Sequence, residues 1–229
     1  MSDDPIIQNS SKKALVFGAS GLVGSHVVSL LLEHPAYNEV HAFYRSGSET
    51  QFEKLQKQVI DFEKLEDYQH LIQGNDLFIC LGTTIGKAGS KKNFYHLEYE
   101  YITTIAKIAE TNKVGQVLLI SSMGADAKSM FFYSQVKGLI EDKIKTMNFW
   151  SIHFLRPSVL LGQREESRPM ESFAAGAGLA LRAMGPKIFS KITPIEAHKV
   201  ALSMVKLAQE TKSGVFYHSS DVLAKLGRK

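Results

Sequence analysis

A tyrosine and a lysine four residues apart are the side chains in this sequence best suited to acid–base chemistry. Tyr133 and Lys137 share one face of a predicted helix, because residues at positions i and i+4 are neighbours on a helical surface. Of the eight tyrosines, only Tyr133 has a lysine at this spacing. A tyrosine ionises near pH ~10 in isolation, and a fixed ammonium beside a phenol favours the ionised form. The pair therefore predicts a proton donor or acceptor that works near neutral pH.

Two serines lie just upstream of this pair. Ser121 and Ser122 follow the apolar run 117–120, which predicts a strand. A hydroxyl at that strand end is placed to hold a substrate carbonyl oxygen beside Tyr133, and Lys137 is also placed to bond the ribose of a nicotinamide. A Tyr-x-x-x-Lys spacing alone is common on surface helices, so the catalytic interpretation depends on the neighbouring motifs.

The strongest of these motifs is a glycine-rich turn near the N-terminus. Gly18, Gly21 and Gly24 follow the apolar run 14–17 and open an apolar helix that ends near Glu33. The first glycine permits a tight turn, the second lets a pyrophosphate approach the backbone, and the third lets the helix pack on the strand. The helix N-terminus adds amide donors and a positive dipole end. The turn predicts dinucleotide binding by Gly18, Ser20, Gly21, Leu22, Val23 and Gly24.

The end of the second predicted strand indicates which dinucleotide binds. An NAD site usually has an acid there to hold the ribose 2′-hydroxyl. Here Arg45 follows the strand, and its guanidinium can pair with a 2′-phosphate, which predicts NADP(H). Glu49 remains an alternative ribose partner. Asp61 has two open interpretations, as a contact of the adenine amino group or as the N-cap of a helix starting at Phe62.

Strands alternate with helices along the chain. Strands are predicted at 14–17, 40–44, 58–61, 76–81, 117–120, 150–155 and 215–218. Helices are predicted up to 33, then at 62–72, from 94 to about 111, at 131–146 and at 194–210. This order predicts an α/β fold of Rossmann type, a doubly wound and mostly parallel sheet with helices on both faces.

One domain fits a chain of 229 residues. We expect 1–11 to be a flexible lead-in and 157–229 to form a small substrate-side region. The segments 82–93 and 164–185 are expected as loops of undefined role.

Composition narrows the function classes. The net charge is +4, but lysines are scattered rather than gathered on one face, so no nucleic-acid partner is predicted. The single cysteine, Cys80, excludes an intrachain disulfide and favours a reducing compartment. No metal-binding spacing of histidines or cysteines occurs, and no apolar run reaches the ~20 residues of a membrane span. With no secretory signal pattern at the N-terminus, the expectation is a cytoplasmic protein.

The chain resembles the short-chain dehydrogenase/reductases in their extended or atypical branch, most closely the NADPH oxidoreductases related to the HIV Tat-interactive protein. The resemblance rests on the motifs at 17–24, 80–84, 86–89, 121–126, 133–138, 155–157 and 166–169. It implies that Tyr133, Lys137 and Ser122, with Ser121 as the alternative serine, form the catalytic set. It also implies that Leu81 and Gly82 line the cofactor, that the segment from Pro157 to Leu160 passes the nicotinamide, and that Arg168 reaches the ligand.

The expected function is therefore an NADP(H)-dependent oxidoreductase that reduces a carbonyl or oxidises an alcohol of a small-molecule substrate. Two alternatives stay open. One is an NADPH-sensing regulator that binds a protein partner and turns over little, and the other is a nucleotide-sugar epimerase with tightly bound NAD. The short C-terminal region speaks against the epimerase. Whether the chain forms a homodimer is also open.

Overall fold

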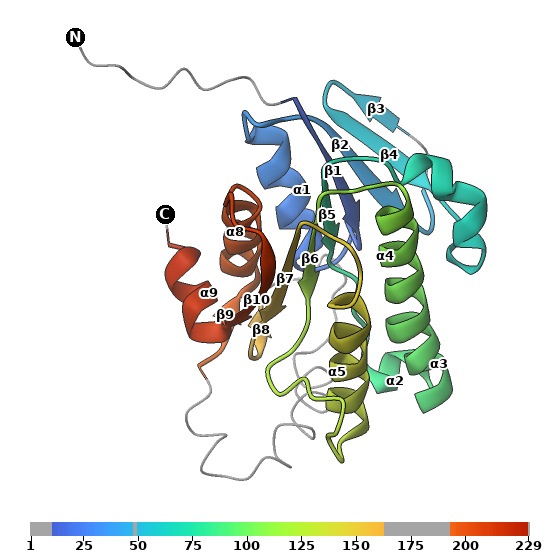
Figure 1. Ribbon diagram of the computed structural model, residues 1–229, viewed down its shortest axis with the longest axis vertical. Helices are drawn as coiled ribbons and strands as arrows, with labels where there is room; N and C mark the ends of the chain where they lie inside the picture. Colours follow the sequence, from blue (N-terminus) through green and yellow to red (C-terminus); the bar gives the residue numbers. More distant parts are fainter. Residues whose placement is uncertain (1–10, 48–49, 163–192, 229) are drawn as a thin grey trace.

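The computed structural model describes residues 11–47, 50–162 and 193–228 (Figure 1). Four features of the sequence interpretation lie outside these ranges: the lead-in before residue 11, Glu49, the expected loop 164–185 with the motif 166–169, and Arg168 within that loop.

An eight-stranded sheet with the order β10-β7-β6-β5-β1-β2-β4-β3 forms the centre of the described chain. All neighbouring strands pair in parallel except β3 and β4, which are antiparallel. The strands are β1 (Lys12–Phe17), β2 (Tyr37–Tyr44), β3 (Thr50–Phe52), β4 (Leu55–Val59), β5 (Asp76–Ile79), β6 (Gln116–Ile120), β7 (Ser151–Arg156) and β10 (Gly214–Ser219). The predicted doubly wound, mostly parallel sheet is confirmed.

The strand order reverses beside β1. From β1 the chain builds outward through β2 and β4, and it then returns to β5 on the other side of β1 and continues to β6, β7 and β10. Ligands of such sheets bind beyond the carboxyl ends of the strands at this switch point. The predicted glycine turn lies there, directly after β1.

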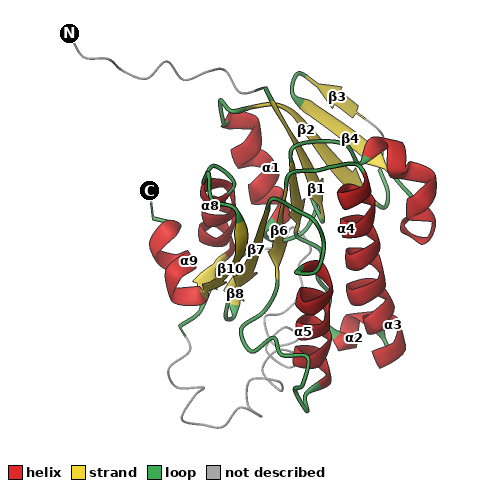
Figure 2. Cartoon of the chain, in the orientation of Figure 1, coloured by secondary structure: helices red, strands yellow, loops and turns green. Residues whose placement is uncertain are grey.

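Helices cover both faces of the sheet (Figures 1 and 2). On one face lie α1 (Gly24–Glu33), α8 (Ala197–Leu207) and α9 (Ser220–Leu226). On the other lie the 3₁₀ segment η1 (Phe62–Leu71), α4 (Tyr101–Thr111) and α5 (Phe132–Ile144). None of the helices in the described ranges is long and apolar enough to cross a membrane.

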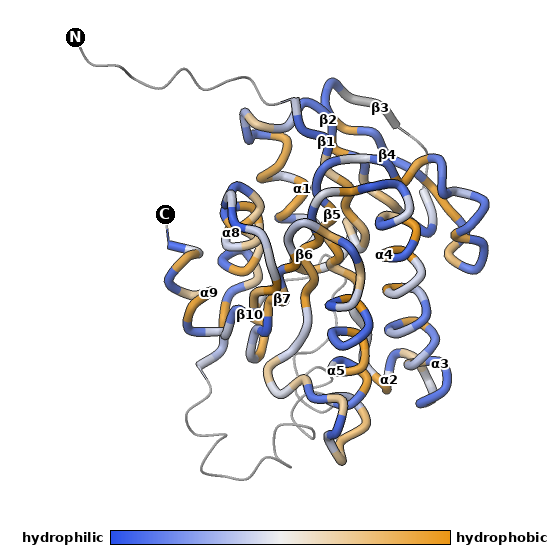
Figure 3. Tube along the Cα trace, viewed as in Figure 1, coloured by the Kyte–Doolittle hydropathy of each residue, from blue (hydrophilic) through white to orange (hydrophobic). Residues whose placement is uncertain are grey.

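Each layer of helices buries its own apolar cluster against the sheet. One cluster joins β1 and β5 to α4 and α5 through Phe17, Ile79, Ile105 and Ile140, all fully buried. The other cluster joins the opposite faces of the same strands to α1 and α8. Strands covered on both faces are expected to be apolar throughout rather than alternating. Figure 3 shows this as orange along the central strands.

The third strand and its surroundings differ from the prediction. β4 spans Leu55–Val59 rather than 58–61, and it pairs with β3 in an antiparallel hairpin that the sequence did not predict. The connecting residue Glu53 has a positive φ of 38°. Short hairpin turns are usually recognised in a sequence by an Asn-Gly or Asp-Gly pair, and this turn contains neither pair.

The segment 82–93, expected as a loop, contains two short helices. α2 (Ile85–Ala88) begins at Thr84, whose hydroxyl accepts a hydrogen bond from the Lys87 amide. α3 (Lys91–Tyr95) begins at Ser90, which caps the Asn93 amide in the same way. A π-helical turn η2 (His96–Glu100) then connects α3 to α4. The sequence also did not predict α9 or the small parallel sheet of β8 (Leu160–Leu161) and β9 (Ile195–Glu196).

Candidate active site

The glycine turn has the geometry that its spacing predicts. Gly18 has a φ of +82°, which favours glycine, and its carbonyl oxygen accepts a hydrogen bond from the Gly21 amide at 2.9 Å. A Cβ on Gly24 would lie 2.1 Å from the Gly18 oxygen. Only glycine at position 24 therefore allows α1 to start this close to the turn, as predicted.

The turn also touches the end of β5. A Cβ on Gly18 would lie 2.6 Å from the carbonyl carbon of Cys80 and 2.7 Å from the amide nitrogen of Leu81. The Cys80 amide in turn donates to the Phe17 oxygen at 2.8 Å. The segment that leads into Leu81 and Gly82 therefore lies against the glycine turn.

The first turn of α1 begins directly at the glycine turn, and its Ser25 amide donates to the Gly21 oxygen at 3.0 Å. Val23 occupies the N-cap position, and no side chain in the described part of the chain caps the helix there. The leading amides of a helix have no partner within the helix, and the helix dipole favours negative charge at that end. Phosphate groups are natural partners for such amides.

The ends of β6 and β7 meet at the same edge of the sheet. The Ser121 amide donates to the Leu155 oxygen at 2.7 Å, and the Met123 amide donates to the Pro157 oxygen at 3.0 Å. Pro157 leads into β8, which begins at Leu160. A Cβ on Gly162, just after β8, would lie 2.6 Å from the Leu22 side chain. The serines and the segment after β7 are thus joined to the glycine turn.

The two serines are not equivalent. Ser121 is buried, with 5% of its surface exposed, and its hydroxyl has no hydrogen-bond partner among the described residues. Ser122 is half-buried, and its hydroxyl donates to the Met123 oxygen at 3.3 Å. A substrate oxygen can reach only a hydroxyl with exposed surface, so this difference favours Ser122.

Tyr133 and Lys137 lie one turn apart on α5, as their spacing predicts. The half-buried Tyr133 ring packs on Phe94 with ring centroids 5.6 Å apart. Gly138 lets the loop after Ser122 reach this helix, because a Cβ there would lie 2.1 Å from the Ala127 amide nitrogen. This loop therefore packs against the part of α5 that carries Lys137.

Lys137 has a partner that sequence reasoning missed. It is 4% exposed, and its Nζ lies 2.6 Å from an oxygen of Glu98, which is 1% exposed. Burial by itself lowers the pKa of Lys137, but the charges of Glu98, Tyr133 and Glu141 outweigh burial and raise it above its ordinary value. The ammonium that the sequence placed beside Tyr133 and a nicotinamide ribose is therefore also paired with a carboxylate. No motif pointed to Glu98, because only the fold brings it beside α5.

Arg45 and Asp61 lie near the carboxyl ends of β2 and β4. Arg45 is exposed, and its guanidinium makes no ion pair with a described residue. Asp61 accepts a hydrogen bond from the Glu63 amide at 3.0 Å as the N-cap of η1, which favours the capping interpretation of this residue. The Glu63 carboxylate is itself occupied by Tyr101 and His96.

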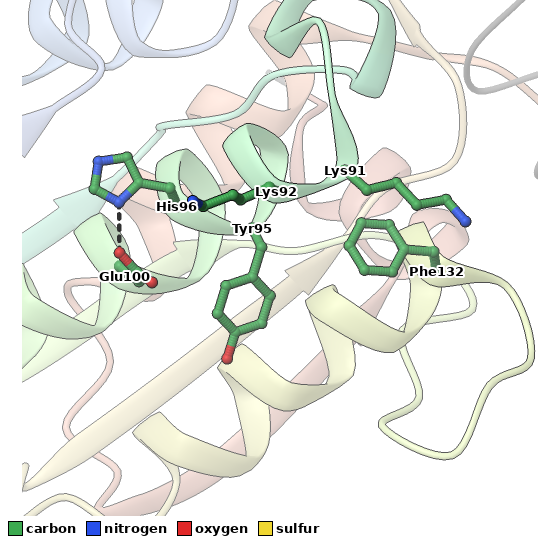
Figure 4. Close-up of a pocket in the computed structure, with 6 residues that line it drawn as sticks. All are labelled: Lys91, Lys92, Tyr95, His96, Glu100 and Phe132. Carbon is green, nitrogen blue, oxygen red and sulfur yellow. Dashed lines mark hydrogen bonds and ion pairs between the residues drawn. The ribbon is translucent and has the colours of Figure 1, made fainter.

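A shallow pocket lies on the outer surface of α3, η2 and the start of α5 (Figure 4). It is lined by Lys91, Lys92, Tyr95, His96, Glu100 and Phe132. The close-up shows His96 turned toward Glu100, to which it is bonded. None of the predicted site residues lines this pocket, so it is separate from the site at the strand ends.

Comparisons with known proteins relate the chain to NAD(P)H-binding proteins. A family described as NAD(P)H-binding matches residues 18–150. HTATIP2 of Rattus norvegicus is 36% identical over 178 residues, which cover 76% of this chain and 72% of the relative. FMP52 of Candida albicans is 31% identical over 222 residues, which cover 92% of this chain and 96% of the relative.

Solved structures share the fold. WbmH of Bordetella bronchiseptica, solved with NAD+, superposes with a TM-score of 0.67 at 16% identity, over 92% of this chain and 76% of that one. A short-chain dehydrogenase family protein of Francisella tularensis superposes with a TM-score of 0.66 at 18% identity, over 93% of this chain and 99% of that one.

One expectation is wrong on these comparisons. The FMP52 relatives are mitochondrial proteins, which contradicts the prediction of a cytoplasmic protein. That prediction depended on a missing secretory signal and a single cysteine. The first argues only against secretion, and the second does not distinguish one reducing compartment from another.

Proposed function

Because the chain belongs to the NAD(P)H-binding family of atypical short-chain dehydrogenase/reductases that includes HTATIP2 and FMP52, we propose that it is an NADP(H)-dependent oxidoreductase. It reduces a carbonyl or oxidises an alcohol of a small molecule. The observation that supports this most strongly is the placement of the glycine turn and of Tyr133 and Lys137 around the same edge of one sheet.

The residues around the switch point fit a dinucleotide. Glycines at 18, 21 and 24 keep the turn clear of side chains, and the first amides of α1 have no side-chain cap among the described residues. The pyrophosphate is assigned to this turn, from Gly18 to Gly24. The nicotinamide half is assigned to Leu81, Gly82 and the segment from Pro157 to Leu160. Arg168, which lies outside the described residues, keeps its assignment from the resemblance.

We assign the 2′-phosphate of NADP(H) to Arg45. The residue directly follows β2, where a dinucleotide's adenosine ribose lies in folds of this type. No acidic side chain stands between Tyr44 and the described end of the segment at Gly47. A guanidinium pairs with phosphate through charge-assisted hydrogen bonds.

The bound cofactor supplies the hydride that adds to the carbonyl carbon. The side chains of this chain handle the oxygen and the proton. The Tyr133 hydroxyl donates its proton to the carbonyl oxygen, and the Ser122 hydroxyl holds that oxygen by a hydrogen bond. The Lys137 ammonium sits one helical turn from Tyr133 and places a positive charge on the same helix. In the oxidising direction the alcohol carbon would give its hydride to the oxidised dinucleotide, and Tyr133 would take the proton of the alcohol hydroxyl.

Replacement of Tyr133 by phenylalanine tests the assignment. With NADPH and a panel of small aldehydes and ketones, we expect Tyr133→Phe to lower kcat by about 10²–10⁴-fold, the usual contribution of a general acid. The affinity for NADPH, measured by fluorescence titration, should stay within about twofold, because the variant removes only the hydroxyl.

Tyr99→Phe is the matched control, since Tyr99 is also half-buried and packed on the same cluster but has no lysine four residues on. It should keep full turnover. A Tyr133→Phe protein that turns over like wild type would overturn the proposal, and NAD released from the purified protein on denaturation would favour the epimerase instead.

A further inference from the structure

Glu98 is a buried carboxylate that the proposed mechanism does not use. It lies in the π-helical turn η2 and is 1% exposed. A charged group this deeply buried needs a partner, and Glu98 has two. One oxygen lies 2.6 Å from the Nζ of Lys137, and the other accepts a hydrogen bond from the Thr83 amide at 2.5 Å.

These two contacts connect separate parts of the site. Lys137 lies on α5, one turn from Tyr133, whereas Thr83 belongs to the loop after β5. The Glu98 oxygen that bonds Thr83 also lies 3.9 Å from where a Cβ of Gly82 would be. Through one carboxylate, the loop assigned to the cofactor is therefore tied to the helix assigned to the proton transfer.

The backbone of η2 presents Glu98 to this position. A π-helical turn has one more residue than an α-helical turn, so it shifts the direction of the side chains that follow. Single π turns inside helices occur frequently at functional sites. Here the turn interrupts an otherwise helical run from Lys91 to Thr111 at the position of the buried carboxylate.

The other charges around Lys137 do not substitute for Glu98. Tyr133 and Glu141 both act on the ammonium from α5. Glu141, however, is bonded by two nitrogens of Arg156 on β7. Among the described residues, Glu98 is therefore the carboxylate that forms an ion pair with Lys137, whereas Glu141 forms its ion pair with Arg156.

We propose that Glu98 is a positioning residue for the oxidoreductase reaction: its carboxylate holds the Lys137 ammonium in place and fixes the cofactor-facing loop through the Thr83 amide. This inference rests on the proposed function. It gives Glu98 the role of fixing the positions of Lys137 and of the loop. It also makes the negative charge of Glu98 part of the pH dependence of the site.

The direction of the pH effect follows from charge. The Glu98 carboxylate raises the pKa of the Lys137 ammonium, which lies 2.6 Å from it. A neutral glutamine at 98 removes that charge, so the Lys137 ammonium loses its proton at lower pH.

Glu98→Gln is the test, with Glu100→Gln as the matched control on the same turn. Glu100 is exposed and bonds His96, away from Lys137. In Glu98→Gln we expect the limb of the pH–rate profile that Lys137 sets to move to lower pH by about one pH unit or more, the usual effect of removing an adjacent charge. We also expect the dissociation constant for NADPH to rise at least threefold. Glu100→Gln should change neither quantity.

Glu98→Asp keeps the charge but is one methylene too short to bridge Thr83 and Lys137. It should leave the pH limb in place and weaken NADPH binding, so it tests the inference even if Glu98→Gln does not fold. Thermal unfolding identifies the folded variants. A folded Glu98→Gln with the wild-type pH limb and NADPH affinity overturns the inference, as does a Glu98→Asp with wild-type affinity. A wild-type protein that binds no NADPH contradicts the proposed function instead, and so does a Tyr133→Phe variant that keeps wild-type turnover.

Discussion

At the scale of single residues, the site depends on which hydroxyl can reach a substrate. Ser121 is buried without a hydrogen-bond partner among the described residues, whereas Ser122 is half-buried at the end of β6. We expect Ser122→Ala to lower kcat by about 10²-fold, as loss of one oxyanion hydrogen bond usually does. Ser121→Ala should keep turnover and leave the free energy of unfolding unchanged within about 1 kcal/mol, because it removes an unpaired buried group. Steady-state kinetics and urea unfolding check both variants, and the reverse pattern would assign the role to Ser121.

The sequence could identify those residues of the site that depend on local spacing. Tyr133 and Lys137 share a helix face because they are four residues apart, and that follows from helix geometry alone. Glu98 could not be found in this way. It is 39 residues from Lys137, and their contact depends on the packing of η2 against α5.

At the scale of elements, two glycine variants separate the two costs of adding a side chain at Gly18. One cost comes from the left-handed backbone, and the other comes from the close contact between the glycine turn and the end of β5. Gly18 and Gly89 have nearly the same φ, +82° and +79°, but a Cβ on Gly89 would meet nothing within 4 Å. Gly89→Ala should lower the free energy of unfolding by about 1 kcal/mol, the cost of a left-handed backbone. Gly18→Ala adds overlap with the Cys80–Leu81 backbone and should lower it by about 3 kcal/mol in total.

Urea unfolding of the two glycine variants measures this difference directly. Equal losses in the two variants would mean that the turn and the end of β5 do not pack as closely as the structure has them. The NADPH affinity should fall only for Gly18→Ala, because Gly89 lies at the end of α2, outside the glycine turn.

Element boundaries were predictable where the hydrophobic pattern is long and unbroken. The strand at 76–79 and the helices α1 and α5 appear within a few residues of their predicted limits. Short elements were not. α2 and α3 depend on the cap hydroxyls of Thr84 and Ser90, which a loop interpretation of a Gly-, Thr- and Lys-rich segment overlooks. The hairpin of β3 and β4 depends on pairing with β2 rather than on its own turn residues.

At the scale of the whole molecule, the alternation of strands and helices was enough to predict the fold, and it places the candidate site at the carboxyl ends of the strands. Right-handed crossovers and parallel pairing leave few arrangements for such a chain. The proposed choice of NADP(H) over NAD rests instead on one exposed side chain, Arg45, at the end of β2. That choice defines the central claim, an NADP(H)-dependent oxidoreductase.

Fluorescence titration of the wild-type protein and of Arg45→Ala with NADPH and NADH tests this claim most directly. We expect wild type to bind NADPH at least about tenfold more tightly than NADH, since hydrogen bonds to charged groups contribute about 1.5–3 kcal/mol. Arg45→Ala should lose that preference and keep its NADH affinity. Lys57→Ala, which removes a positive charge from the adjacent strand β4, should keep the preference. Equal affinities for the two dinucleotides in wild type would contradict the NADP(H) assignment, and binding of neither would contradict the central claim itself.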